Sequence, residues 1–150
     1  MTTIGEKVGD FTLKDQHGKD FTLSEYAGKK VLLSFHPLAW TSVCAKQMQS
    51  LEENRESFEK KNTVAVGVSV DSTPSKKAWA KELKVENTRL LSDFWPHGGL
   101  ANRLGIFRNK EGFSERANII IDEKGHAVFI KVYPIPELPD INEILLFINT

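Results

Sequence analysis

The chain has 150 residues, of which 40% are hydrophobic and 27% are charged, an ordinary composition for a globular protein. Twenty basic residues balance twenty acidic ones, which argues against a nucleic-acid or anionic-membrane surface because both need a basic field. No apolar stretch is long enough to cross a bilayer, so we expect neither a nucleic-acid nor a membrane partner.

The length and the single cysteine narrow the class of protein further. A chain of this size fits one domain, and no linker-like segment divides it, so we predict a single domain over residues 1–150. One cysteine allows no intrachain disulfide, and the first residues contain no apolar leader segment. Both features favour a reducing, cytoplasmic location.

The N-terminal part of the chain predicts a hairpin, a strand and a helix. Alternating runs at residues 11–13 and 21–23 flank a glycine-containing segment, as in a β-hairpin. The apolar run over residues 30–35 predicts a buried strand. From residue 42 to about residue 60, apolar side chains recur at three- and four-residue steps, which predicts an amphipathic helix.

The middle of the chain continues to alternate between strand and helix. Residues 63–70 are nearly all apolar or β-branched, as expected of a strand buried on both faces. A capping segment then opens a helix over residues 75–83. Residues 90–93 predict a short strand, and residues 98–104 predict a short helix.

The C-terminal part predicts a second hairpin and a last helix. Strand-like runs at residues 116–122 and 127–132 flank a Glu-Lys-Gly turn. Asp140 can cap the last helix, with Glu143 as its capping-box partner. The order of elements predicts an α/β, thioredoxin-like fold: a central mixed β-sheet flanked by helices, with an N-terminal β-hairpin extension.

The single cysteine follows the first central strand and enters the predicted helix in its first turn. Helix N-termini carry partial positive charge and unpaired N–H groups, and both favour a thiolate. Cys44 is therefore a candidate nucleophile, although a lone cysteine is also a common small core residue. Pro37 fixes the connecting loop, and Thr41 can either cap the helix or direct its hydroxyl group at the sulfur.

The pattern Pro37-x-x-x-Thr41-x-x-Cys44 resembles the signature of the peroxiredoxin (AhpC/TSA) family. Together with the Asp-Phe-Trp-Pro-His segment at residues 93–97 and the downstream Arg116, the chain is most similar to the one-cysteine alkyl hydroperoxide reductase E type. The resemblance covers nearly the whole chain.

The resemblance implies a thiol-dependent peroxidase that reduces hydrogen peroxide and organic hydroperoxides. The Cys44 thiolate would attack one peroxide oxygen and become a sulfenic acid. Thr41 and the backbone N–H groups near Val43 and Cys44 would hold the two oxygens, and Arg116 would stabilise charge on sulfur and oxygen. This step needs no cofactor and no metal.

Two residues depart from the family pattern. Gln47 stands where many members have a glutamate that orients the active-site arginine; an amide can still accept an N–H bond, but Gln47 can equally be a helix surface residue. His36 stands where a tyrosine is usual. It can titrate near neutral pH beside the thiol, or it can be a packed residue at the strand end.

Two tryptophans bear on the substrate and on assembly. Trp40 and Trp95 can form an apolar wall of the substrate pocket, which would suit organic hydroperoxides, or they can pack in the core. Family members often dimerise through loops near the cysteine, and Trp40, Phe94 and Trp95 would suit that contact. We therefore predict a homodimer.

No second cysteine is present to resolve the sulfenic acid of Cys44. An external thiol must therefore reduce it: a low-molecular-weight thiol, or a thioredoxin-like or glutaredoxin-like protein. An alternative function is a redox sensor or binding module of the same fold that relays oxidation to a partner. A thioredoxin-like disulfide reductase ranks last, because such enzymes usually need two close cysteines.

Overall fold

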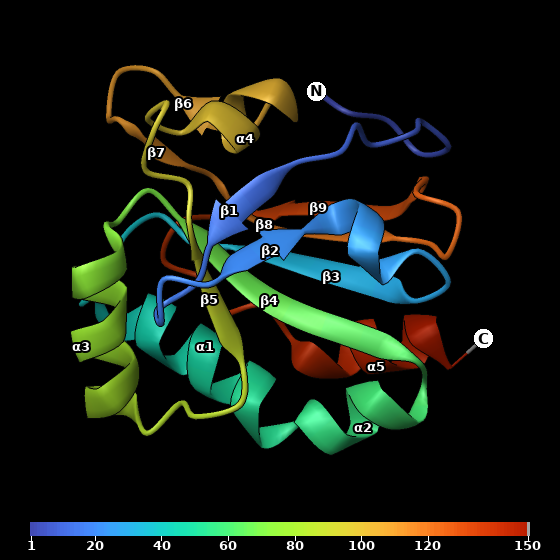
Figure 1. The fold of residues 1–150 in the computed structure, drawn as a ribbon, viewed down its shortest axis with the longest axis horizontal. Helices are drawn as coiled ribbons and strands as arrows, with labels where there is room; N and C mark the ends of the chain where they lie inside the picture. Colours follow the sequence, from blue (N-terminus) through green and yellow to red (C-terminus); the bar gives the residue numbers. More distant parts are fainter. Residues whose placement is uncertain (150) are drawn as a thin grey trace.

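The computed structural model describes residues 1–149 as an α/β fold around a seven-stranded mixed sheet (Figure 1). The strand order is β2-β1-β5-β4-β3-β8-β9, and a separate two-stranded sheet pairs β6 with β7. The strands are β1 (Thr12–Lys14), β2 (Asp20–Thr22), β3 (Lys30–Phe35), β4 (Thr63–Ser69), β5 (Arg89–Ser92), β6 (Phe107–Arg108), β7 (Phe113–Ser114), β8 (Arg116–Ile121) and β9 (Ala127–Tyr133).

Helices complete the predicted α/β architecture. A 3₁₀ turn, η1 (Leu23–Tyr26), precedes the α-helices α1 (Ser42–Glu53), α2 (Arg55–Lys60), α3 (Thr73–Leu83), α4 (Gly99–Arg103) and α5 (Ile141–Ile148). The predicted mixed sheet, its flanking helices and the N-terminal hairpin formed by β1 and β2 are confirmed. Within residues 1–149, no helix is long and apolar enough to cross a membrane.

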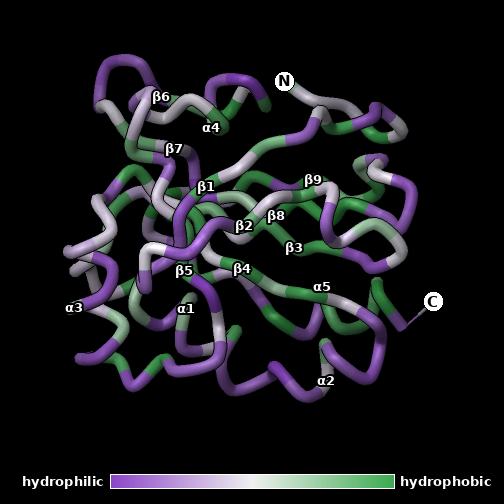
Figure 2. The backbone as a smooth tube through the Cα atoms, viewed as in Figure 1, coloured by the Kyte–Doolittle hydropathy of each residue, from purple (hydrophilic) through white to green (hydrophobic). Residues whose placement is uncertain are grey.

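The core lies on both faces of the sheet because the central strands alternate their side chains. On β3, Leu33 and Phe35 belong to the hydrophobic cluster beneath α4 and the N-terminal segment, whereas Leu32 belongs to the cluster with α1 and α3. Ile120 of β8 joins the second cluster and Ile119 the first. Figure 2 shows the hydrophobic colour concentrated in these inner strands, with hydrophilic residues along α2 and α3.

The pairing of β3 with its two neighbours positions the candidate site. β3 runs parallel to β4 and antiparallel to β8, with Phe35 opposite Ala117. Because of this register, the first residue of β8, Arg116, lies at the same sheet edge at which β3 ends and the chain turns toward Cys44. Two residues 72 positions apart in the chain are thereby brought to one place.

The helix predicted from residue 42 to about residue 60 is in fact two helices that are interrupted at Asn54. The Asn54 side chain donates to the carbonyl of Ser50, and Arg55 Nη1 donates to the carbonyl of Glu52. Asparagine favours such local bonds over helix continuation. The apolar periodicity carries across the break because both helices pack on the same face of the sheet, so periodicity alone did not reveal it.

The last helix begins as predicted at Asp140, whose carboxylate accepts from the N–H of Asn142. The predicted capping box is wrong, because Glu143 uses its carboxylate elsewhere. It accepts from Lys131 Nζ and from the Tyr133 hydroxyl group, both on β9. Glu143 therefore ties α5 to the sheet edge and does not close the helix terminus.

A close contact between β4 and α1 gives a first testable prediction. A Cβ atom at Gly67 would clash with Met48 Sδ and would lie 3.0 Å from Leu90 Cδ2. We expect Gly67→Ala to lower the free energy of unfolding by about 1–3 kcal/mol, the usual cost of overpacking, as measured by urea denaturation. The loss should be smaller in a Met48→Ala background; equal losses in both backgrounds would rule out this contact as the cause.

Candidate active site

Cys44 is the third residue of α1, and its side chain is buried, with 1% of its surface exposed. It therefore lies in the first turn, where backbone N–H groups have no partner within the helix and the helix dipole is positive. Thr41 occupies the N-cap position, but its side chain makes no capping bond. Its hydroxyl group donates to the carbonyl of Leu38 at 2.9 Å, so it neither caps the helix nor donates to the sulfur.

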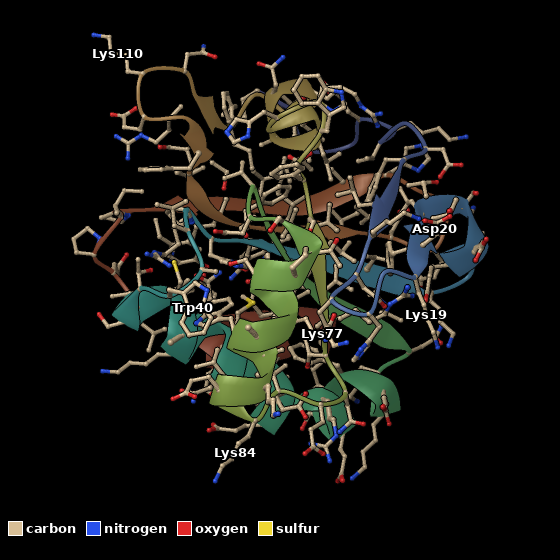
Figure 3. All side chains as sticks on the ribbon, turned by 60° about the vertical axis from the view of Figure 1, so that its left-hand side comes forward. Lys19, Asp20, Trp40, Lys77, Lys84 and Lys110 are labelled. Atoms are coloured by element: carbon tan, nitrogen blue, oxygen red, sulfur yellow. The ribbon has the colours of Figure 1, made fainter. Side chains whose placement is uncertain are left out.

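The loop that leads to Cys44 is tied to β4 and α3. The N–H of Ala39 donates to Asp71 Oδ2 at 2.8 Å, and the Ser69 hydroxyl group donates to the same oxygen at 2.7 Å. Trp40 has a φ of 70°, and its indole N–H donates to Ser75 Oγ at 3.1 Å. Figure 3 shows the Trp40 ring lying against α3. These contacts hold the loop and, with it, the start of α1.

Arg116 is buried at the start of β8 and contacts the sulfur of Cys44 directly. Its Nη1 atom donates to Cys44 Sγ at 3.3 Å and to Gln47 Oε1 at 2.7 Å, while its Nε atom donates to the carbonyl of Ile135 at 2.8 Å. The side chain is 2% exposed. A guanidinium group fixed at this distance stabilises negative charge on sulfur.

Gln47 is buried, so the alternative that it is a helix surface residue is wrong. Besides accepting from Arg116, its amide nitrogen donates to Ser34 Oγ at 2.7 Å and to the carbonyl of Phe35 at 3.1 Å. The amide thus uses both its acceptor and its donors, which a glutamate could not do. Arg116 is held by a neutral group that is itself anchored to β3.

A cavity of about 250 Å³ lies beside this cluster. Three of the predicted site residues, Cys44, Trp40 and Gln47, do not line it, and neither does Trp95, which is 83% exposed. The expected wall of two tryptophans is therefore wrong, since the contact with Ser75 holds Trp40 away on α3. The cavity is lined instead by Pro37, Leu38, Thr41, Ser42, Val43, Phe113, Arg116, Ile135 and Pro136.

His36 is completely buried at the end of β3. Burial, together with the charges of Lys76 and Arg116, holds its pKa well below the usual value. The alternative that His36 titrates near neutral pH is therefore wrong, and it is the packed strand-end residue. Its Nε2 atom lies 3.0 Å from Lys76 Nζ.

Lys76 on α3 was not identified from the sequence. It is completely buried, and burial lowers its pKa to about 7, while the charges of Asp71 and Cys44 oppose that shift. The one signal in the sequence is its spacing: Lys76 lies three residues before Trp79, on the face that packs inward. Lysine is otherwise so rarely buried that a surface position is the ordinary expectation.

The role of Gln47 in holding Arg116 gives a second prediction. Gln47→Met keeps the side-chain length but removes every hydrogen bond, which leaves a buried Arg116 N–H without its acceptor. We expect a loss of about 1–3 kcal/mol in the free energy of unfolding and slower Cys44 oxidation by peroxide. The matched control is Gln49→Met on the same helix, which should change neither. Unchanged stability and rate in Gln47→Met would contradict the contact's importance.

Within residues 1–149, no group of three or more His, Cys, Asp or Glu side chains gathers closely enough to hold a metal ion. The cluster of thiol, guanidinium and threonine beside a small cavity instead suits a nucleophilic attack on a small substrate by a thiolate.

Comparison with known proteins gives a consistent result. Residues 4–130 match the AhpC/TSA family. Alkyl hydroperoxide reductase E of Mycobacterium tuberculosis is 36% identical over 93% of this chain and 92% of its own length. Peroxiredoxin-2 of Mus musculus is 34% identical over 97% of this chain and 77% of its own length.

Solved structures agree. The reduced 2-Cys peroxiredoxin of Plasmodium vivax superposes with a TM-score of 0.89 at 26% identity, covering 99% of this chain and 81% of that one. AhpC of Enterococcus faecalis shares the fold, with a TM-score of 0.91 at 22% identity, covering 99% of this chain and 92% of that one. The thioredoxin-like fold of peroxiredoxins is thereby confirmed. The chain belongs to the AhpC/TSA family and is a peroxiredoxin, a thiol-dependent peroxidase with a single cysteine.

Proposed function

We propose that Cys44 is the peroxidatic residue and that it reduces both hydrogen peroxide and organic hydroperoxides. The thiolate forms a bond to one peroxide oxygen, the O–O bond breaks, and the other oxygen leaves as alkoxide or hydroxide and takes up a proton. Sulfur is oxidised to sulfenic acid, and the peroxide is reduced to an alcohol or water. The observation that carries this proposal is the 3.3 Å contact between Arg116 Nη1 and Cys44 Sγ beside the cavity.

The Thr41 hydroxyl group and two backbone N–H groups would hold the two oxygens of the peroxide. The Thr41 hydroxyl group donates to Leu38, so its oxygen lone pairs remain available to accept from a peroxide O–H. The N–H groups of Val43 and Cys44, at the helix start, would hold the oxygen that develops charge. Pro37 is buried and fixes the loop.

The cavity wall supports organic hydroperoxides as substrates alongside hydrogen peroxide. Leu38, Val43, Phe113 and Ile135 present apolar surface next to Arg116. An alkyl group bound there would lose water contact, at a gain of about 25 cal/mol per Å² of apolar surface. Gln47 would act on the substrate only through Arg116.

Recycling falls to an external thiol, since Cys44 is the only cysteine in the chain. Low-molecular-weight thiols and thioredoxin-like or glutaredoxin-like proteins are the candidate reductants. Steady-state peroxide consumption with glutathione, thioredoxin and glutaredoxin systems, each supplied separately, would identify which class supports turnover. A single cysteine also supports a reducing compartment, and we propose the cytoplasm.

The direct test of the intermediate is chemical trapping. Reduced protein mixed with one equivalent of hydrogen peroxide and dimedone should gain one dimedone adduct on Cys44, located by mass spectrometry of peptides. Cys44→Ser should gain none. No adduct on the wild-type protein, with the thiol still free, would overturn the proposed peroxidase mechanism.

We further propose that residues 1–150 form one domain, because both hydrophobic clusters share the seven-stranded sheet.

We also propose that two copies of the chain form a homodimer through a contact near the active-site loop. Trp40, Phe94 and Trp95 are 55%, 51% and 83% exposed, and aromatic residues are enriched in such contacts. Light scattering at tens of micromolar, on the order of a weak dimer's dissociation constant, should give twice the chain mass. A monomer, or a dimer unchanged by Trp95→Asp, would contradict this contact.

A further inference from the structure

Lys76 is an unusual residue for its position, and it takes no part in the reaction of Cys44 with peroxide proposed above. It is completely buried. Among the ion pairs formed by residues 1–149, none includes Lys76. A buried ammonium group without a paired carboxylate is costly. Such groups are concentrated at functional sites.

The direct partner of Lys76 is His36. His36 Nδ1 lies 3.4 Å from the carbonyl of Ser34, and Nε2 lies 3.0 Å from Lys76 Nζ. A neutral ring with its proton on Nδ1 donates to Ser34 and accepts from the amine. Lys76 Nζ also lies over the Trp79 ring, 5.9 Å from its centroid, in a cation–π contact. Both contacts stabilise the amine in its charged form.

Charged groups on neighbouring elements influence the protonation of Lys76. Cys44 on α1 and Asp71 after β4 both favour the charged amine. The charge of Arg116 on β8 disfavours a positive charge on His36. The Asp71 carboxylate already accepts from Ala39 and Ser69, so its negative charge is shared with the active-site loop.

The topology places the two cations on different sides of the cysteine loop. β3, which ends at this loop, lies between β4 and β8. Arg116 reaches Cys44 from β8, whereas Lys76 belongs to α3, the helix that connects β4 to β5. Arg116 therefore contacts the sulfur from the β8 side, and Lys76, held by His36, belongs to the helix that follows β4 on the other side of β3.

We propose that Lys76 is a second cation of this site, a positioning residue that holds its proton more firmly while Cys44 is a thiolate and releases it more readily once Cys44 becomes a sulfenic acid. The release of the Lys76 proton on oxidation of Cys44 rests on the proposed function. The sulfur loses its negative charge on oxidation, so the attraction between the thiolate and the protonated amine of Lys76 is lost. The departing alkoxide or hydroxide takes up one proton, and Lys76 releases one to solvent. The two together leave the net proton count of the step unchanged.

The first test compares Lys76→Met with Lys77→Met, an exposed neighbour on the same helix (Figure 3). The readout is the rate of Cys44 alkylation by iodoacetamide against pH, which needs no peroxide. In Lys76→Met the midpoint should move to higher pH, with about a tenfold lower rate at pH values below both midpoints. The rates should converge at high pH, where the thiol is fully ionised in both proteins. Lys77→Met should match the wild type.

An unchanged midpoint in Lys76→Met would overturn the proposal. Because alkylation does not depend on peroxide chemistry, a wild-type protein that fails to reduce peroxide would refute the proposed function and leave this test intact. Circular dichroism would show whether Lys76→Met is folded, and a second measurement serves if it is not.

That second measurement follows Lys76 itself in the full chain. In protein labelled with ¹³C-lysine, Lys76 should titrate near neutral pH, well below the surface lysines, which titrate near about 10.4. Cys44→Ser removes the thiolate, so the Lys76 midpoint should fall, by the same amount by which Lys76→Met raises the alkylation midpoint. Equal Lys76 midpoints in the reduced wild type and in Cys44→Ser would show that the two groups are not coupled.

Discussion

Replacing Arg116 with alanine is expected to lower the second-order rate constant of Cys44 oxidation by hydrogen peroxide by about 10²–10³-fold. The substitution removes the N–H donor 3.3 Å from the sulfur and the fixed positive charge that faces the cavity. Both act on negative charge that shifts from sulfur to oxygen during the reaction. Stopped-flow measurement of the rate constant on reduced protein checks this prediction.

Arg55→Ala is the matched control, since Arg55 lies on α2 with its side chain 41% exposed and should react like the wild type. Arg116→Lys keeps a charge but loses the planar group that contacts Cys44, Gln47 and Ile135 together. We expect its rate to fall between those of alanine and arginine. An Arg116→Ala protein that is folded and as fast as the wild type would refute the proposed site.

Lys76→Met is expected to stabilise the protein, by about 2–4 kcal/mol at pH 6. Burial lowers the pKa of Lys76 in the folded protein to about 7 from a usual value of 10.5. Between these two values the unfolded chain binds the proton and the folded chain does not. The free energy of unfolding of the wild type therefore rises with pH across this window, and the penalty is fully present below about pH 7.

Urea denaturation of both proteins between pH 6 and pH 10 measures this effect. The difference in free energy of unfolding between Lys76→Met and the wild type should be largest at pH 6. It should shrink as the pH rises from 7 toward 10.5, because above 10.5 wild-type Lys76 is neutral in both the folded and the unfolded states. A Lys76→Met protein that is less stable than the wild type at every pH would show that Lys76 serves the fold. A gap that does not change with pH would show that its charge is not the cause.

Much of the fold follows from local patterns in the sequence. The β-branched run that forms β4 and the alternating strands of the two hairpins are long enough to identify each element. The position of Cys44 follows as well, because a strand, a proline-containing loop and an amphipathic helix can join in few ways. The contact with Arg116 needed more than patterns: the resemblance to a family supplied it, since 72 residues separate the pair.

Other features depend on three-dimensional packing and have no local signal. Lys76 and its neighbour Lys77 are the same residue type on one helix, yet only Lys76 points into the core. Trp40 is apolar and next to the site in sequence, but its backbone conformation and its bond to Ser75 place it on α3. The break at Asn54 was hidden because the apolar residues on both sides of it pack against the same face of the sheet.

The most direct test of the central claim is the rate at which reduced protein reacts with hydrogen peroxide, followed by stopped-flow tryptophan fluorescence. Trp40 lies four residues before Cys44 and should report its oxidation. We predict a rate constant orders of magnitude above that of a free thiol, and no such phase in Cys44→Ser. A wild-type rate no faster than that of a free thiol would contradict the assignment of Cys44, Arg116 and Thr41 as a peroxide-reducing site.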